Sequence, residues 1–340
     1  MADSSYQQMK QSLANGEVAQ LNLFYGEEAY LREHYMSQIK KLLLPAGMET
    51  FNLHELSGKD FTIERLEQDI DCLPMMSERT LIVVTDVDIF KANEDTRKRL
   101  EQLFENLPDY VCLLFHYDIL EYKPDARMKL TAAFKKHGLI VPFVRQERSD
   151  LIAWVKRRFK ADGHEIDSKL AEYLIFLCGD LMHNLISEIG KISSFAQGHA
   201  ITRSDIDEVA TPQIDAVVFT LTDAFSQRDF DKAFRTLTDL YHMQEAPIKL
   251  LAVIGRQFRQ IYAARLCVDQ TKGSRHLMEL FGMRSSYPAE KLMGYGRRFS
   301  YEWCVEAVRK AAQTDLAMKS TGRDGEELLT EMLLELALTC

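Results

Sequence analysis

The 340-residue chain lacks the cysteine spacing of a disulfide-rich or zinc-binding protein. Its six cysteines lie at positions 72, 112, 178, 267, 304 and 340, and none belongs to a Cys-x-x-Cys pair. Four of them lie in apolar or mixed segments, which favours small buried residues in a reducing cytoplasm; these are Cys112, Cys178, Cys267 and Cys304. The nine histidines form no His-x-x-x-His pair, so the spacing of possible ligands predicts no metal site.

Long apolar runs and a secretory leader are also missing. No stretch approaches the roughly 20 apolar residues that a membrane helix needs. The first residues, MADSSYQQMK, lack the basic and apolar segments of a secretory signal. A formal net charge of −9 excludes bulk electrostatic attraction to DNA or to an anionic membrane. The sequence therefore predicts a cytoplasmic protein without a membrane partner, in which any contact with DNA needs a local basic patch.

The chain also lacks the common motifs for catalysis and for nucleotide binding. No G-x-S-x-G elbow, kinase signature, G-x-G-x-x-G loop or catalytic Cys–His–Asn signature occurs in the chain. The segment Leu21–Tyr25, with Gly26 and a predicted helix after it, has the order of a phosphate-binding loop. It lacks the Lys and Ser/Thr of such a loop, and Glu27 and Glu28 occupy the positive end of the helix dipole. We therefore expect a nucleotide-binding topology that binds no nucleotide and no other cofactor.

The first half of the chain alternates between apolar, β-branched runs and amphipathic segments. Predicted strands cover residues 21–25, 49–56, 81–84, 111–115 and 139–144. Helices are predicted at about 29–44, 62–71, 94–107 and 126–137, the last ending at Gly138 as a C′ residue. The alternation predicts a parallel, doubly wound α/β sheet. The third strand is followed by the acidic residues Asp86 and Asp88. Such an acid is interpreted either as a magnesium ligand, as in P-loop ATPases, or as a cap of a turn or helix.

The strand pattern stops past Arg145, and 340 residues suffice for two or three domains. Helices are predicted at 151–162, capped by Ser149-Asp150, at 168–177, at 181–195 and from 202. Thr211-Pro212 marks a boundary, and seven helices follow at 216–226, 230–242, 247–270, 275–281, 287–299, 301–320 and 326–339. We therefore predict an α/β domain over 1–147, a small helical domain over 148–211 and a helical domain over 212–340.

Two basic groups lie on these helices. Lys156-Arg157-Arg158 is interpreted as a solvated helix face or as a phosphate contact. The predicted helix 247–270 has one apolar stripe, and Arg256, Arg259 and Arg265 lie off it, on a face that is either solvated or meets partners or DNA.

The segment Asp71–Val84 combines a loop with a buried strand. Leu73, Pro74, Met75 and Met76 precede the β-branched run at 81–84, and Pro74 is expected to end the preceding helix. Two interpretations of the methionines are open. They fill the local core, as methionine usually does, or they form an adaptable apolar knob for a partner.

Six segments together resemble the delta-subunit family of bacterial DNA polymerase III, part of the sliding-clamp loader. They are LNLFYGEEAYLRE (21–33), CLPMMSERTLIVV (72–84), 124–138, CGDLMHNLISEIGKI (178–192), KLLAVIGRQFRQIYAAR (249–265) and DLAMKSTGRDGEELLTEMLLELAL (315–338). The resemblance implies an AAA+-like sheet domain without a P-loop, a small helical lid domain and a helical C-terminal collar domain. It also implies a non-catalytic subunit of the polymerase holoenzyme that binds no ATP.

The same resemblance implies partners and a binding site. Family members bind the β sliding clamp and open one interface, while gamma/tau subunits supply ATP hydrolysis and delta-prime completes the loader on primed DNA. The clamp-binding residues map onto Leu73, Pro74, Met75 and Met76, with Met75 and Met76 as the inserting pair. Many such motifs use Leu or Phe, so the Met-Met pair is a departure that bears on affinity.

Two other functions are weighed against the resemblance. An active P-loop-like NTPase is disfavoured by the missing Lys and by Glu27-Glu28, and it predicts ATP binding. A stand-alone helical adaptor or nucleic-acid-binding protein with a degenerate ATPase domain predicts duplex binding with a steep salt dependence.

Overall fold

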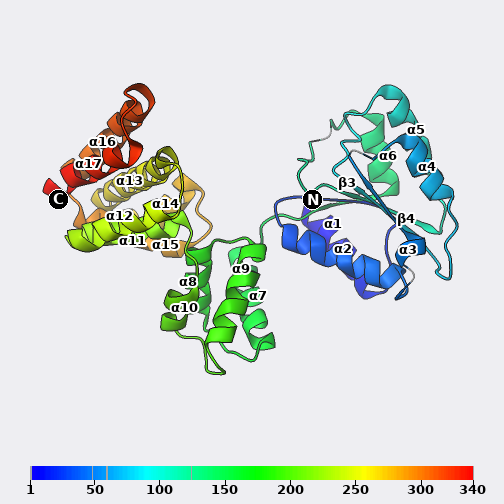
Figure 1. Cartoon of the computed structure of the whole chain (residues 1–340), viewed down its shortest axis with the longest axis horizontal. Helices are drawn as coiled ribbons and strands as arrows, with labels where there is room; N and C mark the ends of the chain where they lie inside the picture. Colours follow the sequence, from blue (N-terminus) through cyan, green and yellow to red (C-terminus); the bar gives the residue numbers. More distant parts are fainter. Residues whose placement is uncertain (1, 48, 59, 124, 340) are drawn as a thin grey trace. The chain divides into compact units, whose positions relative to one another are not determined.

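The computed structural model describes residues 2–47, 49–58, 60–123 and 125–339. The chain forms two compact units, Met1–Arg145 and Gln146–Cys340, which are coloured blue to green and green to red in Figure 1. The first unit is α/β, and the described part of the second contains only helices.

The first unit is built on a five-stranded parallel sheet with the order β2-β3-β4-β1-β5. Its strands are β1 (Leu21–Tyr25), β2 (Leu53–Ser57), β3 (Thr80–Thr85), β4 (Val111–His116) and β5 (Leu139–Pro142). Strands buried on both faces are expected to be continuously apolar, and β3 and β4 are nearly so. The predicted parallel α/β fold is therefore confirmed, with β3 and β4 at its centre.

Six helices accompany the sheet: α1 (Ala2–Ala14), α2 (Ala29–Leu43), α3 (Glu49–Asn52), α4 (Ile63–Asp71), α5 (Glu94–Glu105) and α6 (Lys129–His137). Figure 1 shows α1 and α2 on one side of the sheet and α4, α5 and α6 on the other. Alternate residues of each strand serve the two sides: Ile82 and Val84 pack in the core under α4–α6, and Leu81 and Val83 are buried on the opposite face.

Two predicted elements of this unit begin several residues later than expected. The second strand was expected from residue 49, but Glu49–Asn52 forms one helical turn, and the pairing with β3 begins at Leu53, opposite Leu81. Helix α6 begins at Lys129, because Asp125 accepts a hydrogen bond from the backbone N–H of Arg127 and forms a turn before it.

Gly138 does end α6, but it is the C-cap residue and not the predicted C′ residue. The residue is extended, with φ −134°. A Cβ atom there would lie 2.8 Å from Cγ of Leu21 and 2.9 Å from the ring of Phe134. Glycine is therefore needed at this position for close packing between the helix end and β1.

The second unit begins with four helices: α7 (Arg148–Ala161), α8 (Ser168–Cys178), α9 (Met182–Phe195) and α10 (Arg203–Val209). The predicted cap at Ser149-Asp150 was wrong, since α7 starts at Arg148 and its N-cap residue is Glu147. Arg148 donates a hydrogen bond to the carbonyl of Glu172 in α8 at 3.0 Å. This contact fixes the first residue of α7 against the neighbouring helix.

Seven further helices complete the unit: α11 (Ile214–Ser226), α12 (Phe230–His242), α13 (Pro247–Asp269), α14 (Ser274–Phe281), α15 (Ser286–Arg298), α16 (Tyr301–Ser320) and α17 (Gly325–Leu338). The predicted apolar stripe of α13 is confirmed, because all its members are buried in one core; they are Leu250, Leu251, Ile254, Phe258 and Ile261. The core continues into α8, where the ring of Phe176 lies 5.1 Å from that of Phe219. A domain boundary at residues 211–212 therefore stays a prediction.

The predicted burial of four cysteines is confirmed. Cys112, Cys178, Cys267 and Cys304 are free thiols buried in the cores. Burial raises the pKa of the Cys112 and Cys178 thiols to about 12, so these side chains are neutral and inert at physiological pH.

Candidate functional site

The loop between α4 and β3 exposes apolar side chains. Leu73 is 71% exposed, Met75 55% and Met76 83%, while Pro74 is partly buried. Exposure at this level shows that the two methionines do not fill the core, which was one of the two interpretations. The other, an apolar knob available to a partner, agrees with their position on a loop fixed to a rigid sheet.

The loop is held at several points. Helix α4 ends at Asp71 and Cys72 is extended, as Pro74 predicts. The side-chain amide of Asn52, at the end of α3, hydrogen-bonds the backbone of Met75. Ser77 Oγ donates to the carbonyl of Leu43 at 3.0 Å. Arg79 donates from its guanidinium to the carbonyl of Val18 at 2.8 Å, which fixes the entry into β3.

An open groove lies beside the loop tip. It has a volume of about 1060 Å³ and is lined by residues 16–18, 41–45 and 76–79. Leu42, on the groove wall, is 44% exposed, and Phe51, next to the Asn52 that bonds Met75, is 53% exposed. The exposed side chains of the loop are therefore accompanied by further exposed apolar residues on α2 and α3. An anchor of this kind, bordered by a groove, is typical of protein–protein contacts.

The opposite, carboxyl edge of the sheet is where α/β folds bind nucleotides. Here the guanidinium of Arg32, from the first turns of α2, occupies it. Arg32 is 2% exposed and donates to the carbonyl of Gly26, to the carboxylate of Asp118 and, at 3.3 Å, to Nε2 of His116. A phosphate-binding loop turns backbone N–H groups towards its anion, whereas this loop turns a carbonyl towards a cation.

The two glutamates flank the helix start as the sequence indicated. Glu28 is the N-cap residue of α2 and is fully buried, and Glu27 pairs with Arg145 at 2.7 Å. Gly26 lies close to β5: a Cβ atom there would be 2.4 Å from the carbonyl oxygen of Phe143. The loop is thus packed against the end of the sheet, with negative charge at the helix terminus.

Asp86 is the turn cap that was one of its two interpretations. Its Oδ1 accepts hydrogen bonds from the backbone N–H groups of Asp118 and Ile119, both at 2.9 Å, and of Leu120 at 3.1 Å. The carboxylate therefore orders the loop after β4 from the end of β3. No group of three or more His, Cys, Asp or Glu in the described part of the chain could hold a metal ion.

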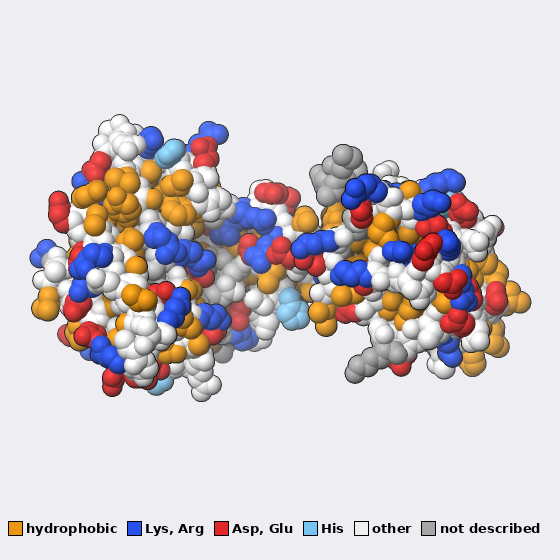
Figure 2. Space-filling view, turned by 90° about the horizontal axis from the view of Figure 1, so that it is seen from above, with side chains coloured by type: hydrophobic (Ala, Val, Ile, Leu, Met, Phe, Trp, Pro, Cys, Tyr) orange, Lys and Arg blue, Asp and Glu red, His pale blue; other side chains and the backbone are white. Residues whose placement is uncertain are grey.

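The basic residues of the second unit are mostly engaged within the chain. Arg256 pairs with Asp215, and Arg265 pairs with Asp269 at 2.6 Å, while Arg259 is exposed. Lys156 donates to Ser168 Oγ at 3.4 Å. On the face drawn in Figure 2, Lys and Arg side chains are interspersed with Asp and Glu, which is typical of a solvated surface.

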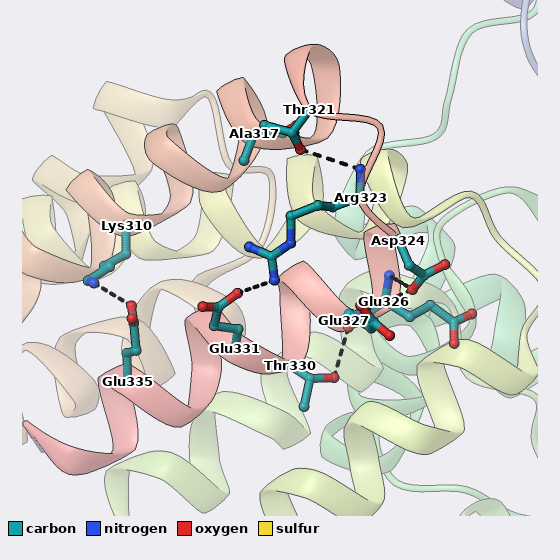
Figure 3. A network of polar contacts seen from close by, with 10 residues as sticks. All are labelled: Lys310, Ala317, Thr321, Arg323, Asp324, Glu326, Glu327, Thr330, Glu331 and Glu335. Atoms are coloured by element: carbon teal, nitrogen blue, oxygen red, sulfur yellow. Dashed lines mark hydrogen bonds and ion pairs between the residues drawn. The ribbon is translucent and has the colours of Figure 1, made fainter.

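The last two helices are joined by a network of polar contacts (Figure 3). Lys310 pairs with Glu335, and Arg323 pairs with Glu331 at 2.7 Å. Asp324 caps α17 by accepting from the N–H groups of Glu326 and Glu327. Three leucine side chains of this hairpin are exposed: Leu316 by 67%, Leu334 by 50% and Leu338 by 89%.

Comparison with known proteins identifies the family of the chain. The model of the DNA polymerase III delta subunit matches residues 22–144, and the model of the C-terminal domain of that subunit matches residues 215–336. Together they cover well over half of the chain. The chain belongs to the DNA polymerase III delta-subunit family. It is therefore a clamp-loader subunit that acts in DNA replication.

Individual relatives agree with this assignment. The chain is 25% identical over 329 residues to the DNA polymerase III subunit delta of Bacillus subtilis, covering 95% of this chain and 94% of the relative. It is 22% identical to a probable DNA polymerase III subunit delta of Aquifex aeolicus, over 92% and 89% of the two chains. The solved structure of the Bacillus subtilis DNA clamp loader delta protein has the same fold, with a TM-score of 0.57, 24% identity and 99% of each chain covered.

Two residues of this delta-family chain were missed by sequence reasoning. Arg32 and Asn52 act through contacts with residues distant in the chain, and neither belongs to a recognisable motif. The one available signal is that Arg32 lies a few residues after Gly26, where a phosphate-binding loop has its Lys.

None of the described helices has the length and apolar character that crossing a membrane requires.

The Arg32 contacts predict a large loss of stability on truncation. We expect Arg32→Ala to lower the free energy of unfolding of the first unit by about 2–4 kcal/mol, because hydrogen bonds to charged groups are removed and buried acceptors lose their donor. Urea denaturation measures the loss. Arg127→Ala is the matched control, since Arg127 is 91% exposed and pairs only locally with Asp125. Equal midpoints for the two variants would contradict the role of Arg32.

His116 predicts a dependence of stability on pH. Burial, and secondarily the charge of Arg32, lower the pKa of His116 below its ordinary 6.5. As the pH falls below 6.5, His116 is protonated in the unfolded chain but stays neutral in the folded chain. The free energy of unfolding therefore decreases until the pH reaches the lowered pKa of the folded state. We expect His116→Gln, which still accepts a hydrogen bond, to remove this part of the acid dependence in denaturation midpoints. An unchanged difference between neutral and acidic midpoints would contradict it.

The filled sheet edge predicts no thermal shift with nucleotide. Tight binding of ATP must stabilise the folded chain by about 2.7 kcal/mol at a hundredfold excess over Kd. We expect the melting temperature with ATP and Mg²⁺ to equal that with inorganic sulfate at the same ionic strength. A rise specific to ATP would show that the edge opens to nucleotide, and equilibrium dialysis with labelled ATP would then give the affinity.

Proposed function

We propose that this delta subunit binds the β sliding clamp through Leu73, Pro74, Met75 and Met76 and opens one interface of the ring. The observation that supports it most is the exposure of apolar side chains on a loop whose backbone is anchored to β3 and α3. Side chains of this kind enter a hydrophobic pocket of a partner and provide most of the binding energy. Opening the clamp allows the loader to place it on primed DNA.

The closed sheet edge supports different roles for the subunits of the loader. Arg32 occupies the edge where an ATPase holds phosphate, which supports a subunit that neither binds nor hydrolyses ATP. The gamma/tau subunits are proposed to supply hydrolysis. The delta subunit then contributes binding energy towards the clamp.

We propose that the helices from α11 onwards form the collar that joins gamma/tau and delta-prime. Support comes from the exposed apolar residues of the α16–α17 hairpin, Leu316, Leu334 and Leu338. In this proposal residues 1–147 are the clamp-binding AAA+-like domain, 148–211 the lid and 212–340 the collar, and the loader acts in the cytoplasm. A stand-alone nucleic-acid-binding role has less support, since Arg256 and Arg265 are paired with carboxylates.

The clamp-binding loop predicts a separation between affinity and stability. We expect the double change Met75→Ser and Met76→Ser to weaken binding of the cognate β clamp by about a thousandfold, if each buried anchor contributes about 2 kcal/mol. Because both side chains are exposed in the free subunit, the denaturation midpoint changes little. Surface plasmon resonance and urea denaturation on the same preparation measure the two effects.

Ile119→Ser is the matched control for this experiment. Ile119 is 87% exposed on another loop of the same unit, so it tests for a general loss of surface hydrophobicity. Clamp affinity is expected to be unchanged in this variant. An intact affinity in the Met75/Met76 variant, or an equal loss in the Ile119 variant, would reject the loop as the clamp-binding site.

A further inference from the structure

The side chain of Asn52 pairs with the backbone of a single residue of the loop. Asn52 Nδ2 donates to the carbonyl of Met75 at 2.8 Å, and the N–H of Met75 donates to Asn52 Oδ1 at 2.7 Å. A side-chain amide has both a donor and an acceptor, so it can pair with N–H and C=O together, as a peptide group does. Asn52 is 0% exposed, and water therefore does not compete for these two bonds.

The position of Asn52 connects the loop to the rigid part of the fold. It is the last residue of α3 and directly precedes Leu53, which begins the pairing of β2 with β3 opposite Leu81. The amide therefore connects the start of β2 to the loop that precedes β3. Two hydrogen bonds hold the backbone of Met75 at this point.

A second anchor holds the other side of Met76. Ser77 Oγ donates to the carbonyl of Leu43, so Met76 lies between two fixed residues. Its φ of +52° is in the left-handed region, and it is the one apolar side chain among the non-glycine residues described with positive φ. Such a conformation is unfavourable for a residue with a Cβ and persists where the surroundings determine it.

We propose that Asn52 is a positioning residue that pre-organises Met75 and Met76 for the clamp. This inference rests on the proposed clamp-binding function of the loop. With Met75 fixed and Ser77 tethered, the free subunit already presents the Met76 side chain 83% exposed on an ordered backbone. Association with the clamp then does not include the entropic cost of ordering the loop, which otherwise weakens binding.

A purely structural role for Asn52 makes a different prediction. In that case Asn52→Ala lowers the stability of the first unit, and the molecules that remain folded bind the clamp with unchanged affinity. Positioning predicts weaker binding by the folded molecules as well. It also predicts faster hydrogen exchange at the Met75 N–H, which loses its acceptor, without a general increase across β3.

The test is a double-mutant cycle on the full-length subunit with the cognate β clamp. We expect Asn52→Ala to weaken clamp binding by about tenfold, which corresponds to about 1.4 kcal/mol. In a Met76→Ala background the same change is expected to cost much less, since residues that act as a unit are not additive. Asn52→Ser, whose short hydroxyl cannot pair with both the N–H and the carbonyl of Met75, is an uncharged second variant that is measured if Asn52→Ala fails to fold.

Asn22→Ala is the matched control. Asn22 is also a buried amide of this unit, 2% exposed, and its Nδ2 donates to the carbonyl of Ala19 at 2.7 Å. We expect it to lose stability and to keep clamp affinity. Equal affinity of the folded wild type and of both Asn52 variants would overturn the inference. An equal loss for Asn52→Ala with and without Met76 would overturn it too.

The clamp affinity of the Met75/Met76 variant distinguishes a failure of this inference from a failure of the proposed function. If the Met75/Met76 variant binds the clamp normally, the proposed site itself fails. If that variant loses binding while the Asn52 variants do not, the site stands and only the positioning role is rejected.

Discussion

The pairing of β3 with β4 is the interaction on which the rest of the first unit depends. All of β3, from Thr80 to Thr85, is in register with Val111 to His116, and both strands are buried between two layers of helices. The residues before and after β3 therefore have fixed positions at opposite edges of the sheet. The apolar loop precedes it at one edge, and Asp86 follows it at the other, where it caps the segment after β4.

The two edges of the sheet have opposite chemistry. At the carboxyl edge, Arg32 is enclosed by a carbonyl, an imidazole and a carboxylate, so a site that binds an anion in related topologies is occupied by the protein's own cation. At the other edge, apolar side chains are left exposed although burial would stabilise them. In this fold the edge that binds ligands in related topologies is closed, and exposed apolar side chains lie at the other edge.

Much of the fold could be predicted from the sequence, because buried parallel strands require apolar, β-branched runs and helices require periodic stripes. The apolar stripe of α13 and the runs of β3 and β4 are examples. The bounds of the edge strand β2 could not be predicted, since Glu49–Asn52 alternates like a strand but forms a helical turn. Arg32 and Asn52 could not be predicted for a related reason. His116 lies 84 residues from Arg32, and Met75 lies 23 residues from Asn52, so these contacts exist only after the sheet has formed.

The left-handed backbone of Met76 restricts which residues evolution can accept at this position. In the proposed clamp-binding role, a hydrophobic pocket of the partner favours a large apolar side chain at residue 76, whereas a positive φ disfavours branching at Cβ. Valine and isoleucine are apolar but branched at Cβ, so they fit a pocket and not the backbone. Glycine fits the backbone but has no side chain to enter a pocket. Unbranched or γ-branched side chains such as Met, Leu and Phe satisfy both. Few residue types therefore satisfy both conditions at residue 76. Neighbouring exposed positions such as Leu73 have no positive φ, so the backbone condition does not apply to them.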